Sequence, residues 1–80
     1  MFDIEYGVDY ADSYEITGYE WDKAMEILSF YLAKMVDDRL ITQEEFEQGM
    51  NWVTGVVVED HGVRVPATFG DLTIALTLTD

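Results

Sequence analysis

Carboxylates are the side chains of this sequence that could do chemistry, and they are concentrated near its start. Eight lie within the first 26 residues: Asp3, Glu5, Asp9, Asp12, Glu15, Glu20, Asp22 and Glu26. Carboxylates can work in pairs as a general acid and a general base. They can also bind hard cations or accept charge-assisted hydrogen bonds from Arg and Lys. The rest of the sequence decides among these three roles.

The sequence offers little for catalysis. His61 is the single histidine and follows Asp60 in a predicted turn, where adjacent residues seldom face each other as a general base requires. Ser13 and Ser29 have no neighbouring base, and no glycine-rich phosphate loop follows a strand. Cysteine is absent, so thiol chemistry and thiolate metal sites are absent too. We therefore expect a protein that is not an enzyme and needs no cofactor.

One segment, 34–45, invites comparison with a calcium-binding loop, because Ile41 and Glu45-Phe46 resemble the end of such a loop and a predicted helix lies on either side. The first and third positions of such a loop would be Lys34 and Val36, which are not suitable oxygen ligands, and no glycine occupies the turn. We interpret the segment as a corner between helices. A domain that binds divalent cations through its acidic surface stays a weaker alternative.

The net charge is the most informative property of the composition. The 80 residues carry 17 Asp and Glu against 4 Lys and Arg, a formal charge of -13. Small domains stay soluble at a net charge of about 2 to 8 in magnitude, and a larger excess strains the compact state by self-repulsion. Phosphates are bound by Lys and Arg, so direct binding to nucleic acid or to anionic membranes is disfavoured. We expect a basic partner instead.

Composition also predicts a folded chain. Five Tyr, four Phe and two Trp distinguish it from disordered acidic tails, which are poor in aromatic residues. The length fits a single domain over residues 1–80, which would bury only about 60% of its unfolded surface. A homodimer or a bound partner would add stability. The start lacks the pattern of a signal peptide, and no apolar run approaches the ~18 residues of a membrane span, so we expect a cytoplasmic protein.

Two kinds of periodicity organise the first half. Phe2, Ile4 and Tyr6 alternate with acids, which predicts a strand with one buried face. Tyr14 to Thr17 alternates in the same way and suggests a second strand. From Glu20 to about Asp38 the spacing changes to that of an amphipathic helix, whose apolar stripe is Trp21, Met25, Leu28, Leu32 and Met35.

The second half begins with a helix signal. Thr42 and Glu45 form a capping box, and we predict a helix from there to Gly55. The segments Val56–Glu59 and Val63–Val65 are typical of a hairpin around residues 60–62.

The last part of the chain contains the clearest strand. Pro66 ends the preceding strand or places it at an edge, residues 67–71 form a loop, and residues 72–78 alternate regularly. The predicted order is β(β)ααβββ. This order indicates an α+β fold, with an antiparallel sheet of about four or five strands and two helices packed on one face.

The acids of the first third suggest a binding surface. On a strand, Asp3 and Glu5 project from the same face about 6.6 to 6.8 Å apart, which is about two nucleotides of axial rise along one DNA strand. Tyr6 and Tyr14 share the apolar phase and are expected in the core, whereas Tyr10 is the best exposed aromatic anchor. The predicted partner-binding residues are Asp3, Glu5, Asp9, Tyr10, Asp12, Glu15, Glu20, Asp22 and Glu26.

In size, acidity and lack of catalytic groups, the chain resembles the phage-encoded inhibitors of bacterial defence, the anti-CRISPR and antirestriction proteins, several of which mimic DNA. The resemblance rests on size and composition. It implies a non-catalytic inhibitor in the bacterial cytoplasm that occupies the nucleic-acid groove of a CRISPR effector or restriction enzyme and excludes DNA. The alternative is an acidic interaction module for another basic protein, such as an antitoxin or an assembly subunit.

Overall fold

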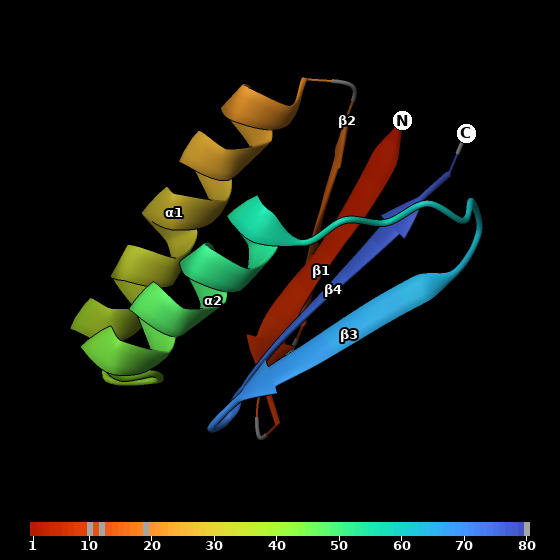
Figure 1. The fold of residues 1–80 in the computed structure, drawn as a ribbon. Helices are drawn as coiled ribbons and strands as arrows, with labels where there is room; N and C mark the ends of the chain where they lie inside the picture. Colours follow the sequence, from red (N-terminus) through yellow and green to blue (C-terminus); the bar gives the residue numbers. More distant parts are fainter. Residues whose placement is uncertain (10, 12, 19, 80) are drawn as a thin grey trace.

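A computed structural model describes residues 1–9, 11, 13–18 and 20–79 (Figure 1). The described residues form four strands and two helices, which confirms the predicted α+β class. In chain order these are β1 (Phe2–Val8), β2 (Tyr14–Gly18), α1 (Trp21–Asp37), α2 (Gln43–Gly55), β3 (Arg64–Phe69) and β4 (Leu72–Leu78). Neither helix has the length and apolar composition needed to span a bilayer within the described part of the chain.

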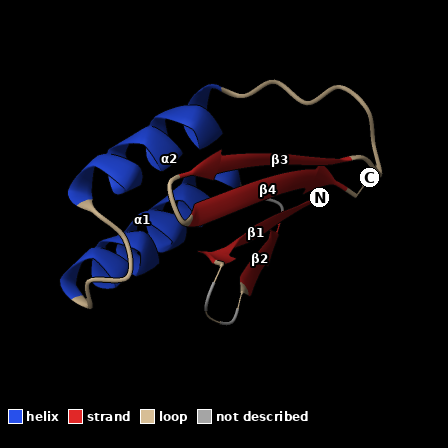
Figure 2. Ribbon diagram, turned by 90° about the horizontal axis from the view of Figure 1, so that it is seen from below, coloured by secondary structure: helices blue, strands red, loops and turns tan. Residues whose placement is uncertain are grey.

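The strands form one antiparallel sheet in the order β2-β1-β4-β3. The first and last strands of the chain therefore lie side by side at its centre, with β2 and β3 at the two edges. Both helices cover one face of this sheet, and the opposite face is left open (Figure 2). One face of the sheet therefore packs against the helices, and neither helix covers the other face (Figure 2).

The core lies between the sheet and the helices. Alternation along β1 turns Phe2, Ile4, Tyr6 and Val8 inward, each of them at most 6% exposed. Leu28 and Leu32 of α1 are fully buried against them, and each contributes about 1.5–3 kcal/mol by leaving water. The predicted strand and helix stripe are thereby confirmed.

A single carboxylate ties the start of α2 to the sheet. The backbone N–H of Thr42 donates to Glu45 Oε1 (2.7 Å), while the Glu45 N–H donates to Thr42 Oγ1 (3.1 Å), as the capping box predicts. The Asp71 N–H donates to the other oxygen, Oε2, at 2.9 Å. These backbone donors, Thr42 first and Asp71 second, hold the pKa of Glu45 below its ordinary value. Gly70 has a φ of 63°, and a Cβ there would collide with Glu45.

The predicted strand at Val56–Glu59 is wrong, because these residues form a connection without strand pairing. Both edges of β4 are already occupied, by β1 and by β3. Val56 and Val58 still pack against the core, while Val57 is 80% exposed. The alternation of Val56, Val57 and Val58 therefore arises because every second side chain packs on the core, and not because the segment pairs in the sheet.

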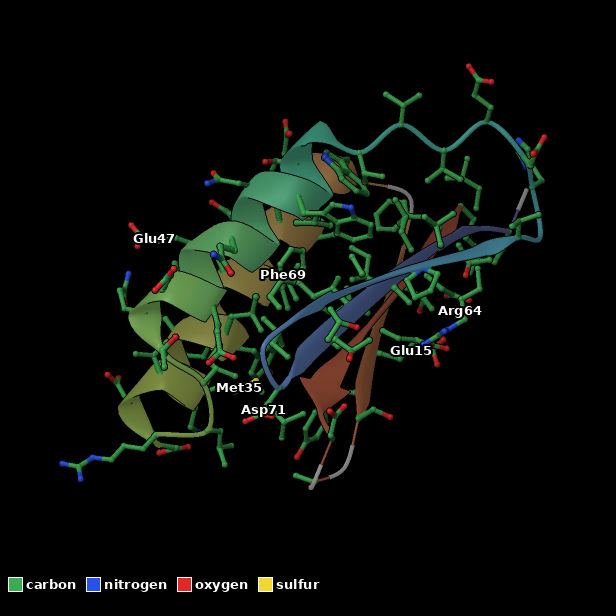
Figure 3. The ribbon with its side chains drawn as sticks, turned by 60° about the horizontal axis from the view of Figure 1, so that its bottom comes forward. Glu15, Met35, Glu47, Arg64, Phe69 and Asp71 are labelled. Carbon is green, nitrogen blue, oxygen red and sulfur yellow. The ribbon has the colours of Figure 1, made fainter. Side chains whose placement is uncertain are left out.

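The predicted loop at residues 67–71 is also wrong, because β3 continues through Pro66 to Phe69. Only a tight turn at Gly70 and Asp71 separates β3 from β4. A proline is tolerated within β3 because β3 is an edge strand, where one side of the backbone needs no ladder partner. Phe69, at its end, points toward α2 (Figure 3).

Candidate acidic interface on the open sheet face

Three of the predicted acids share the open face of the sheet. Asp3 and Glu5 are the outward positions of β1, and Glu15 is an outward position of β2. The register places Glu5 directly opposite Glu15 and Asp3 opposite Thr17. We call Asp3, Glu5 and Glu15 the open-face acids. Strand periodicity and register together bring them to one surface.

The pairing of Glu5 with Glu15 is unfavourable by itself. Side chains directly opposite each other on antiparallel strands have Cβ atoms about 4.5–5.5 Å apart, and like charges there destabilise the sheet. Glu15 is exposed and Glu5 is half-buried, so water screens the repulsion without abolishing it. The sheet therefore holds two negative charges together at a cost in stability.

Arg64 offsets part of this charge from the far edge of the sheet. Its Nε donates to Glu5 Oε2 at 2.9 Å, and the bridge passes over β4 at Ala75, which is 1% exposed. Glu15 and Arg64 lie on the side of the sheet away from the helices (Figure 3). Because the Arg64 and Glu5 side chains are 52% and 45% exposed, the ion pair contributes less than about 1 kcal/mol.

Asp3 holds an unused hydrogen-bond acceptor. Its Oδ1 is buried and has no hydrogen-bond partner among the described residues. Thr17 and Thr77 flank it on the neighbouring strands. An unsatisfied buried acceptor costs about 1–3 kcal/mol. The open face therefore carries more hydrogen-bond acceptors, on Asp3, Glu5 and Glu15, than the described residues supply donors for.

A shallow hollow of about 290 Å³ lies beside the open-face acids, lined by Glu5, Asp9, Arg64 and Thr73 among others. Asp9 is exposed just after β1, and its N–H donates to the Asp71 carbonyl at 3.2 Å. The hollow is near the lower limit of small-molecule pockets. Of its two carboxylates, Glu5 is already paired with Arg64, whereas Asp9 is exposed after β1.

The remaining predicted residues fall elsewhere. Glu20 is the N-cap of α1, although its side chain forms no cap hydrogen bond, and Asp22 and Glu26 are exposed on that helix. They belong to the helix layer and are not brought together with the open-face acids. Tyr10 and Asp12 lie outside the described residues.

Tyr14 was expected in the core, and this expectation is wrong because its side chain is 57% exposed. It follows the inward phase of β2 and stacks on Tyr6, with ring centroids 5.7 Å apart. Edge position explains the difference, since no further strand covers Tyr14. Tyr6 is buried as expected, and burial first, then the neighbouring Tyr31 and Tyr14, raises its pKa.

Sequence reasoning missed two features of the surface. The partnership of Arg64 with Glu5 joins residues 59 apart and had no local signal. Ile27, Phe30 and Tyr31 are exposed apolar residues of α1, and the signal for them was present, because they lie off the predicted core stripe.

No protein-family model, curated protein or solved structure matches this chain. No group of three or more His, Asp and Glu side chains suited to a metal ion occurs within the described ranges. Function therefore has to be argued from charge and geometry.

Proposed function

We propose that this protein is a non-catalytic inhibitor that places its acidic surface in the nucleic-acid-binding groove of a bacterial defence complex, such as a CRISPR effector or a restriction enzyme, and blocks DNA. The observation that carries the proposal is the register of Glu5 opposite Glu15. With Asp3 on the same face, it gathers three carboxylates on the uncovered side of a protein of net charge -13.

The spacing of the open-face acids supports mimicry of phosphates. Asp3 and Glu5 lie about 6.6–6.8 Å apart along β1, and Glu5 and Glu15 face each other across about 4.5–5.5 Å. DNA presents phosphates every 3.4 Å of axial rise along each strand. The separation of Asp3 and Glu5 therefore matches about two nucleotides of axial rise, and a groove whose Lys and Arg are arranged for phosphates would find acceptors at that interval on the sheet.

Binding would also relieve the repulsion within the free protein. A guanidinium or ammonium between Glu5 and Glu15 converts a destabilising pair into charge-assisted hydrogen bonds. The cost of holding these charges together in the free state is then recovered in the complex. Long-range attraction would raise the association rate and make binding sensitive to salt.

A capture experiment with matched variants tests the proposal. The tagged protein is used as bait in bacterial lysate, eluted with rising salt, and the captured proteins are identified by mass spectrometry. The test variant is Asp3→Asn/Glu5→Gln/Glu15→Gln. The control is Asp37→Asn/Glu47→Gln/Glu59→Gln, which removes the same amount of charge from exposed acids outside the open face.

The proposal expects capture of a nucleic-acid-binding defence complex that duplex DNA releases, with capture lost in the test variant and kept in the control. Capture of a basic protein indifferent to DNA would instead favour an antitoxin-like or assembly module. Equal loss in both variants would assign binding to total charge and not to the open face. A rise in melting temperature with Ca²⁺ would favour the cation-binding alternative.

A further inference from the structure

A second, chemically different surface lies on the helix side of the sheet, beside β2. It is a groove of about 710 Å³ between β2 and the outer flank of α1. The residues that define this β2 groove are Tyr14 and Ile16 of β2 and Ile27, Tyr31, Lys34 and Asp38 from α1 and its C-cap. No open-face residue except Glu15 contributes to its lining.

The outer flank of α1 extends beyond the sheet beneath it. Residues 27, 31, 34 and 38 form a stripe next to the buried stripe of residues 24, 28, 32 and 35. Ile27 is 39% exposed, Tyr31 44% and the adjacent Phe30 66%. Ile27 and Tyr31 line the groove beside β2, where no described strand lies. The described strands therefore leave this apolar part of α1 uncovered.

The backbone of β2 is open on the same side. β2 ends the sheet, and no described residue pairs with its outer edge. Such an edge is a template for an added strand, and addition to a free edge is a common mode of peptide recognition. The five residues of β2 span about 17 Å, so the edge accommodates a segment of about five or six residues. Alternate side chains of that segment would enter the β2 groove.

The floor of the groove consists of stacked aromatic rings. Tyr6 lies between Tyr14, at 5.7 Å, and Tyr31, at 6.3 Å, with interplanar angles of 28° and 23°. Phe30 meets Tyr31 edge-on at 5.5 Å. Arg side chains stack on such ring faces and are attracted to them.

Charge decides which occupant fits. Glu15 and Asp38 line the groove against one cation, Lys34, within a protein of net charge -13. A second copy would bring an equal negative charge to this edge and is repelled. An arginine-bearing strand gains both the aromatic faces and the carboxylates.

We propose that the free edge of β2 binds an extended, arginine-containing segment of the partner as an additional strand, with alternate side chains seated between Tyr14 and the outer flank of α1. The basic character of the partner rests on the proposed function. The groove itself is independent of the proposed function, because Glu15 is the one open-face acid that lines it and its other residues come from the helix side of the sheet.

A synthetic octapeptide of alternating Arg and Val is the probe, titrated into isotope-labelled protein and followed by NMR chemical shifts. Its comparison is the same peptide N-methylated at alternate backbone amides, which keeps charge and side chains but removes the donors of a strand. We expect shift changes along β2 and along residues 27–38. We expect the N-methylated peptide to bind at least about tenfold more weakly, because strand addition depends on main-chain hydrogen bonds.

Two variants with the same chemical change locate the site. Ile27→Lys places a positive charge in the groove, whereas Val57→Lys makes the same type of change in the connection after α2, where Val57 is 80% exposed. Ile27→Lys should weaken binding of the octapeptide about tenfold, and Val57→Lys should leave it within about twofold. Circular dichroism checks that both variants are folded.

Four results would overturn the proposal. They are absence of octapeptide binding, equal affinity for the two peptides, shift changes confined to the open face, and a protein that is already dimeric through β2 by analytical ultracentrifugation. The assay contains no defence complex, so its failure leaves the inhibitor proposal standing. Octapeptide binding without capture of any DNA-releasable complex would instead overturn the inhibitor proposal alone.

Discussion

Replacing Glu15 with Lys should stabilise the protein while weakening partner binding. Glu15 faces Glu5 across β1 and β2, so Glu15→Lys exchanges a repulsive cross-strand pair for an attractive one. Each such pair is worth roughly 0.2–1 kcal/mol. Loss of the repulsion and gain of the attraction together give roughly 0.4–2 kcal/mol, and because Arg64 already offsets part of the Glu5 charge we take a value near the lower end, about 0.5 kcal/mol. For a domain of this size that corresponds to a rise in melting temperature of about 2–4 °C.

Thermal unfolding followed by circular dichroism measures this effect, at low salt and again at about 1 M NaCl. The Debye length falls from about 10 Å at 0.1 M salt to 3 Å at 1 M, so most of the gain should disappear at high salt. Glu59→Lys is the control, since it changes the net charge equally at an exposed residue of the connection after α2. The difference between the two variants isolates the local pair from the general relief of self-repulsion.

A lower melting temperature for Glu15→Lys than for the wild type would refute the reasoning. So would a gain equal to that of Glu59→Lys, because the register of Glu5 and Glu15 would then have no energetic consequence. If Glu15→Lys were stabilised but bound the partner with unchanged affinity, the repulsion between Glu5 and Glu15 would be supported. Glu15 would then not belong to the partner interface.

Three further predictions concern stability. Glu45→Ala should lower the free energy of unfolding by about 1–2 kcal/mol, measured by urea unfolding at pH 7. Because the pKa of Glu45 is lowered in the folded protein, this advantage of the wild type is complete above the ordinary glutamate pKa of about 4.3. It is lost as the pH falls through the pKa of the folded state. Gly70→Ala should cost at least about 1–2 kcal/mol by the same assay, since its φ is 63° and a Cβ meets Glu45. The raised pKa of Tyr6 means that stability falls as the pH rises past about 10, and Tyr6→Phe should flatten this alkaline decline.

Elements defined by local patterns could be predicted from the sequence. The alternation of Phe2, Ile4 and Tyr6 gives β1, and the Thr42 and Glu45 pair gives the start of α2. These signals need only neighbouring residues, because side-chain direction and capping are decided within one turn or one pleat. The α+β class follows from the order of such elements.

Features decided by long-range pairing could not be predicted. Val56–Glu59 has the composition of a strand, yet β4 has no free edge to offer it. Pro66 predicted either the end of its strand or an edge position, and only the completed sheet decides that β3 lies at the edge and continues through Pro66. Tyr14 has an inward phase, but no strand among the described residues lies beyond β2 to cover its ring, which is 57% exposed.

The candidate interface divides in the same way. That Asp3 and Glu5 share a face follows from strand periodicity alone. That Glu15 joins them requires the register of β1 and β2, and the contact of Arg64 with Glu5 requires the whole sheet order. Composition pointed to the acids as a group, while the register of the sheet determines which of them lie together.

Glu15 is the residue where the two proposed surfaces meet. It projects from the open face opposite Glu5, and it also lines the β2 groove at the sheet edge. A strand added to β2 would direct alternate side chains to opposite faces, so an arginine-rich segment would send some cations toward the stacked tyrosines and others toward Glu15. Such a partner would relieve the unfavourable pairing of Glu5 and Glu15 and would also cover the exposed flank of α1. On the two proposals together, repulsion on one face and uncovered apolar surface on the other are two costs of the free state that one basic partner would remove.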